Sequence, residues 1–124
     1  MLDHLREVVS TARAQGLKIF FVPHNRWQPG DYGSFGFPSP YRTDLDLQLK
    51  QHGVRRITLT GLVANICIEA TGRFGMELGY HVTLVKDATA AFSQEAMHAA
   101  HAINGPTYAQ AILTTEELLP QLYG

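Results

Sequence analysis

Residues 55–61 read Arg-Arg-Ile-Thr-Leu-Thr-Gly, and residues 62–67 continue with Leu-Val-Ala-Asn-Ile-Cys. The first stretch is short, alternates β-branched and apolar residues and ends in glycine, which predicts a buried β-strand. Residues 67–79 have the composition of a helix that stops at its final glycine. Cys67, the single cysteine of the chain, therefore lies where a strand passes into a helix.

The remaining sequence alternates between strand and helix patterns. Short apolar runs predict strands at 18–23, 81–86 and 110–113. Apolar spacing and capping residues predict helices at 3–15, 43–53 and 93–103, and a last helix that starts at Thr115. Such alternation favours right-handed crossovers and parallel strands with helices on both faces. We therefore expect an α/β fold, a three-layer Rossmann-like domain with a short, mainly parallel sheet.

Size and composition narrow the class of protein. A chain of 124 residues suits one domain, here 1–124, and a net charge of −1 gives no sign of a nucleic-acid partner. No apolar run is long enough to span a membrane, and the charged N-terminus does not resemble a secretory signal. A single cysteine fits a reducing compartment, so we expect the cytoplasm.

The position of Cys67 allows two interpretations. A thiol in the first turn of a helix feels the positive end of the peptide dipoles, which stabilises the thiolate. Backbone N–H groups in that turn lack intrahelical partners and can bind an oxyanion. The alternative is a small buried apolar side chain, because free cysteines are commonly buried.

The motif Gly-Leu-Val-Ala-Asn-Ile-Cys-Ile-Glu-Ala-Thr-Gly-Arg at 61–73, with Leu-Gly-Tyr-His-Val-Thr-Leu-Val-Lys-Asp-Ala-Thr at 78–89, resembles the isochorismatase-like cysteine hydrolases. The resemblance implies hydrolysis of a C–N bond in a small amide-like substrate, with Cys67 as the nucleophile. It also implies an oxyanion hole made by the backbone N–H groups of Ala64 and Cys67. A non-proline cis peptide is expected in this turn, at Val63–Ala64.

The chain departs from the family pattern at two catalytic positions. The resemblance implies an aspartate at the end of a strand before the first helix, and this sequence starts at that helix. It also implies a lysine shortly before Thr43, and residues 27–42 contain none. An N-terminally trimmed hydrolase that is weak or inactive is therefore expected. The alternative is a non-catalytic remnant of the scaffold that acts in assembly or interaction.

Residues around the strand ends are candidates for a substrate pocket: His24, Trp27, Phe37 and Val63. The aromatic residues among them can wall a planar substrate, fill a gap in the sheet or contact another subunit. His24 stands in Pro-His-Asn-Arg without the aspartate of a metal motif, so we expect no metal and no cofactor. The resemblance implies a homo-oligomer as the default assembly.

Several other residues have ordinary structural explanations. Asp87 ends a strand and could act as a base, but hydrogen bonding to backbone in the following turn is favoured. Gly72 and Gly75 are predicted to allow close helix–sheet packing, and the spacing of these glycines does not fit a dinucleotide-binding turn. Glu69 and Arg73 are spaced as a surface ion pair. His98 and His101 are three residues apart on a predicted helix and could share a face, which without a third ligand is expected to be solvated or half-buried.

Overall fold

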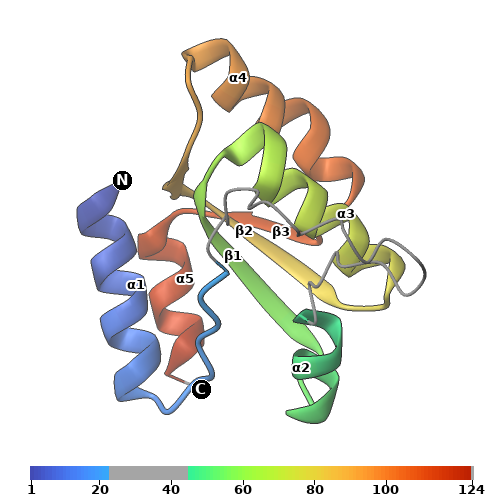
Figure 1. The fold of residues 1–124 in the computed structure, drawn as a ribbon. Helices are drawn as coiled ribbons and strands as arrows, with labels where there is room; N and C mark the ends of the chain where they lie inside the picture. The colour runs from blue at the N-terminus through green and yellow to red at the C-terminus, as the bar shows by residue number, and fades with distance from the viewer. Residues whose placement is uncertain (23–44, 124) are drawn as a thin grey trace, which may run out of the picture.

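The computed structural model describes residues 1–22 and 45–123. Three strands form a parallel sheet in the order β1-β2-β3: Arg56–Leu62, His81–Ala90 and Ala111–Leu113. The helix α1 (Leu2–Ala14) packs beside α5 (Thr115–Leu122) on one face of the sheet, and α3 (Glu69–Glu77) covers the other (Figure 1). This arrangement confirms the predicted three-layer α/β fold.

Shorter helical segments complete the described fold. They are α2 (Leu45–Gln51), the π-helix η1 (Ala64–Ile68), α4 (Gln94–His98), the π-helix η2 (Ala99–Asn104) and the 3-10 helix η3 (Gly105–Thr107). Ser93 caps α4, since its Oγ accepts a hydrogen bond from the Ala96 N–H at 3.1 Å.

Alternation along β2 builds a core on each face of the sheet. Val82 and Leu84 belong to an apolar cluster with Ile57 of β1 and Tyr108, whereas Val85 packs with Val8 of α1 and Leu118 of α5. Successive side chains of a strand point to opposite faces, so one strand serves both clusters. Val82, Leu84 and Val85 are almost completely buried, which makes β2 the central element of the domain.

The register between β1 and β2 shifts near their carboxyl ends. Leu59 pairs with Leu84, but Gly61, two positions later, pairs with Thr89. The extra residues lie on β2 and include Asp87. Such an irregularity redirects side chains at the end of a strand.

The strand predicted at 18–23 is not formed over the described residues. Residues 17–22 have no regular secondary structure, and residue 23 lies outside the described part of the chain. An extended segment counts as a strand only when it exchanges backbone hydrogen bonds with a neighbour. No described strand pairs with residues 18–22, and Phe21 and Val22 are exposed. Phe20 is half-buried and packs against the core cluster of Ile57.

Candidate active site

The turn that carries Cys67 begins three residues earlier than the sequence indicates. Helical geometry starts at Ala64, directly after β1, with Val63 as the extended N-cap residue. The Val63 carbonyl accepts the N–H groups of Ile66 at 3.0 Å and Ile68 at 3.2 Å. Because these bonds already close the first turn, the predicted helix start at residue 67 is wrong.

This first turn is a π-helix that continues into α3. Single π-helical turns are uncommon and frequently occur at functional sites. The wide turn holds Cys67 before α3, and the Thr71 hydroxyl donates a hydrogen bond to the Cys67 carbonyl at 2.8 Å. The cysteine therefore stays at the N-terminal end of the whole helical stretch.

Cys67 is exposed. The alternative of a small buried apolar side chain is therefore wrong for this residue. Ala64 is almost completely buried, and Val63 is half-buried. Within the described residues, no side chain forms a hydrogen bond or an ion pair with the Cys67 thiol.

A non-proline cis peptide lies in this turn, between Leu62 and Val63. The expected bond, Val63–Ala64, is one position further along. The strand extends to Leu62, which still pairs with Ala90 of β2, and the chain turns immediately after it. The cis bond therefore joins the last strand residue to the N-cap of η1.

The other candidate pocket residues, His24, Trp27 and Phe37, lie outside the described residues. Over the described residues, a cleft of about 560 Å³ lies between α1 and α5 and includes His4, Asp87 and Tyr123 in its lining. A second cleft, of about 510 Å³, lies where α2 and α3 end. Neither is lined by Cys67.

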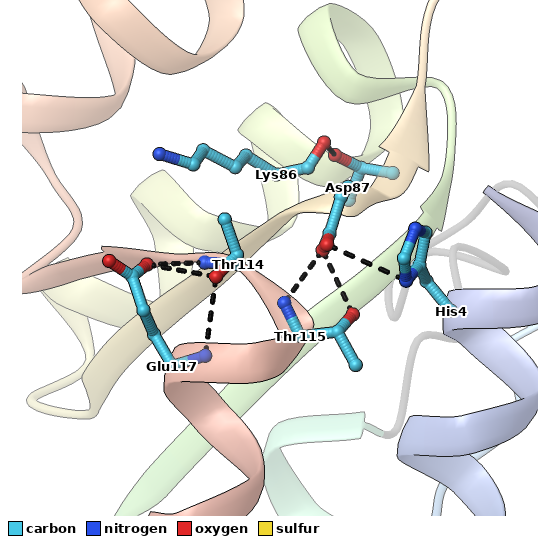
Figure 2. A network of polar contacts seen from close by, with 7 residues as sticks. His4, Lys86, Asp87, Thr114, Thr115 and Glu117 are labelled. Atoms are coloured by element: carbon cyan, nitrogen blue, oxygen red, sulfur yellow. Dashed lines mark hydrogen bonds and ion pairs between the residues drawn. The ribbon is translucent and has the colours of Figure 1, made fainter.

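Asp87 binds the start of α5 (Figure 2). Its Oδ1 accepts hydrogen bonds from the Thr115 N–H at 2.8 Å and the Thr115 hydroxyl at 2.9 Å. Its Oδ2 lies 3.6 Å from His4 Nδ1 of α1. The favoured backbone role is thus confirmed, but the partner belongs to a distant helix and not to the following turn. The sequence signal for it is Thr115, a hydroxyl residue at a helix start.

The two histidines of the α4–η2 stretch have different surroundings. His98 is exposed, whereas His101 is half-buried and its Nε2 lies 2.7 Å from the Thr89 hydroxyl of β2. Burial lowers the pKa of His101, and the nearby Lys86 lowers it further. One histidine is thus solvated and the other half-buried, as their spacing on this helix predicts. In the part of the chain that the structure describes, no three metal-ligating side chains converge.

Comparisons with known proteins identify the class. The sequence profile of the Isochorismatase domain matches residues 31–117. The chain therefore belongs to the isochorismatase family, as its motif around Cys67 predicts.

Particular relatives show how far the similarity extends. The chain is 38% identical over 109 residues to the uncharacterized isochorismatase family protein YwoC of Bacillus subtilis, covering 82% of this chain and 54% of that protein. It is 34% identical over 83 residues to the ureidoacrylate amidohydrolase RutB of Methylobacterium radiotolerans, covering 65% of this chain and 32% of the relative. The chain thus spans about half or less of the length of these relatives.

Solved structures of other proteins share the fold of this chain. A cysteine hydrolase from Pseudomonas syringae pv. phaseolicola superimposes with a TM-score of 0.79 at 18% identity, covering 97% of this chain and 78% of that one. Separately, no helix in the described residues has the length and apolar character needed to cross a membrane.

Proposed function

We propose that this protein hydrolyses a carbon–nitrogen bond of a small amide-like substrate through Cys67. The observation that carries the proposal is the exposed thiol in the first helical turn after β1. Ligands of parallel α/β sheets bind beyond the carboxyl ends of the strands, which is where this turn lies. The name of one relative, a ureidoacrylate amidohydrolase, agrees with this chemistry.

The proposed reaction has two steps. The Cys67 thiolate attacks the carbonyl carbon, a C–S bond forms, and the negative charge moves to the carbonyl oxygen. The backbone N–H groups of Ala64 and Cys67 donate to that oxygen. The C–N bond then breaks, and the nitrogen leaves as ammonia or an amine after taking up a proton. Water cleaves the resulting thioester, which releases the acid and restores the thiol.

The proposed reaction uses no cofactor and takes a small molecule as its substrate. We propose that Val63, the N-cap of η1, contacts the substrate. We expect the protein to act in the cytoplasm and as a homo-oligomer.

A second candidate is a non-catalytic scaffold that acts through assembly. It is favoured by the surroundings of Cys67, because the described residues supply no acid or base in hydrogen-bond contact with the thiol. A nucleophile without an activating partner loses most of its rate.

The deciding experiment measures ammonia or amine release from a panel of small amides by the wild-type chain, Cys67→Ser and Cys67→Ala. We expect release by the wild type that both variants lose, together with a thioester adduct on Cys67 detected by mass spectrometry after acid quench. Equal release by all three proteins would overturn the hydrolase and favour the scaffold. Circular dichroism of each variant confirms that the fold is retained.

A further inference from the structure

The Glu69 carboxylate makes contacts beyond the simple surface ion pair that its spacing predicts. Its Oε1 accepts hydrogen bonds from Arg73 Nε at 3.0 Å and Nη2 at 2.9 Å. Its Oε2 accepts a third from Asn104 Nδ2 at 3.2 Å, at the end of η2. The Glu69 side chain is only 14% exposed, against 45% for Arg73. Glu69 therefore links the helix that follows Cys67 to a second helical segment.

The Tyr108 side chain packs against the same part of α3. Its ring lies against the backbone of Gly72, so a Cβ atom added to Gly72 would overlap the ring. The Arg73 guanidinium carbon lies 5.1 Å from the ring centroid, a distance typical of a cation–π contact. Tyr108 is 2% exposed, and its hydroxyl has no hydrogen-bond partner among the described residues. The ring and the carboxylate thus hold α3 at two neighbouring points.

We propose that Glu69 is a positioning residue for Cys67, acting through its link to Asn104. This inference rests on the proposed function. Cys67 precedes Glu69 by two residues in one continuous helical stretch, and Thr71 ties the Cys67 carbonyl to the next turn. A shift of α3 relative to η2 therefore moves the thiol and the neighbouring N–H groups together. Displacements of about 1 Å in a reacting group can cost about 100-fold in rate.

The test removes the link without changing charge. Asn104→Leu deletes the donor to Glu69 Oε2 and keeps the size of the side chain. We expect its kcat for amide hydrolysis to fall about 10-fold while KM stays within about two-fold, since binding is retained and orientation is lost. We also expect Cys67 in the folded variant to react at least about three-fold more slowly with iodoacetamide, because the thiol is displaced from the N–H groups of the first helical turn.

A paired exchange separates positioning from general damage to the fold. Asn104→Asp places two carboxylates against each other and should slow both reactions. Combining it with Glu69→Gln restores one carboxylate and one amide, since the introduced glutamine can accept from Arg73 and donate to the introduced carboxylate. The double variant should recover most of the wild-type kcat and alkylation rate. Glu77→Gln is the matched control, because it makes the same change at an exposed position of α3.

The outcomes are distinct for the two proposals. Wild-type rates in a folded Asn104→Leu variant would overturn the positioning role, as would a folded double variant that recovers neither rate. If the wild type releases no amine from any amide, the proposed function fails, and the alkylation rates still decide whether Glu69 positions the thiol. If Asn104→Leu does not fold, the comparison of Asn104→Asp with the double variant decides the question.

Discussion

At the scale of single residues, the Asp87 carboxylate joins three elements of the fold. It lies in the irregular part of β2, accepts two hydrogen bonds from the first residue of α5 and faces His4 of α1 (Figure 2). Thr115 is 1% exposed, so water cannot readily replace the carboxylate as the partner of its hydroxyl. These contacts make Asp87 a structural residue in the described fold.

Replacing Asp87 by alanine should therefore destabilise the domain. The change leaves the buried N–H and hydroxyl of Thr115 without their acceptor, which should cost about 1–3 kcal/mol of unfolding free energy. Urea unfolding followed by circular dichroism measures this cost. Glu116→Ala, at an exposed position of the same helical turn, should change stability by less than about 0.5 kcal/mol. Equal effects of the two substitutions would contradict the assignment.

Gly72 is a second residue whose role follows from a close contact. A Cβ atom at this position would overlap the Tyr108 ring. Alanine favours a helix over glycine by about 1 kcal/mol, yet we expect Gly72→Ala to lower the unfolding free energy by about 1–3 kcal/mol because of overpacking. Urea unfolding gives the sign directly. A gain in stability would show that the ring can move aside at little cost.

At the scale of elements, α5 begins with a complete capping box. The Thr114 hydroxyl accepts from the Glu117 N–H at 3.2 Å, and Glu117 Oε2 accepts from the Thr114 N–H at 2.7 Å. The backbone N–H and the hydroxyl of Thr114 both lower the pKa of Glu117. These bonds favour the charged carboxylate in the folded state, so the sequence pattern Thr-Thr-Glu-Glu is a reliable helix start.

This lowered pKa gives the stability of the chain a pH dependence. A carboxyl group with a depressed folded-state pKa stabilises the fold above its unfolded value of about 4.3, and the contribution is lost as the pH falls through the folded value. Glu117→Gln keeps the hydrogen-bonding shape but removes the charge. We therefore expect its Tm to lie below that of the wild type at neutral pH and to approach it as the solution is acidified below about pH 4.

Thermal unfolding followed by circular dichroism over a series of pH values measures this convergence. Glu116→Gln is the control, since Glu116 lies exposed in the same first turn. A Tm difference between the wild type and Glu117→Gln that stays constant from neutral to acidic pH would contradict the capping role of the charge.

The predictability of the elements depends on where their hydrogen bonds lie. The start of helix α5 and the bounds of strand β1 follow from local patterns, a cap in one case and an apolar run in the other, and they are predicted within about one residue. Residues 18–22 have an equally apolar sequence, but a strand needs a neighbour, and an apolar run does not specify which segment pairs with it. The sequence pattern does not predict the early start of η1, because the backbone carbonyl of Val63, and not a side chain, accepts the hydrogen bonds of its first turn.

At the scale of the whole molecule, the family motif predicts the layers and the place of Cys67, because both depend on the order of strands and helices. It does not predict the link between Glu69 and Asn104, which are 35 residues apart. Nor does it predict the pairing of Asp87 with Thr115. Contacts of this kind depend on how helices pack across the sheet, and spacing within one helix carries no information about it.

The outer surface of the domain carries large apolar side chains that no described residue covers. Phe74 of α3 is 70% exposed, and Phe92, just before α4, is 87% exposed. Exposed apolar side chains mark a contact with another protein when they form a large contiguous patch. The homo-oligomer predicted from the family resemblance would cover such a face.

We therefore expect the wild-type chain to sediment as a species larger than its 13.7 kDa monomer. Burying an aromatic side chain removes about 150–250 Å² from water, so replacing Phe74 by lysine should weaken association at least about 10-fold in Kd and leave the fold intact. Analytical ultracentrifugation over a concentration series gives the dissociation constant, and circular dichroism checks the fold.

Glu77→Lys, which adds positive charge on the same helix without removing apolar area, is the matched control and should weaken association less. A wild-type chain that remains monomeric throughout the series would contradict the expected assembly, and a Phe74→Lys variant that associates like the wild type would place the contact on another face.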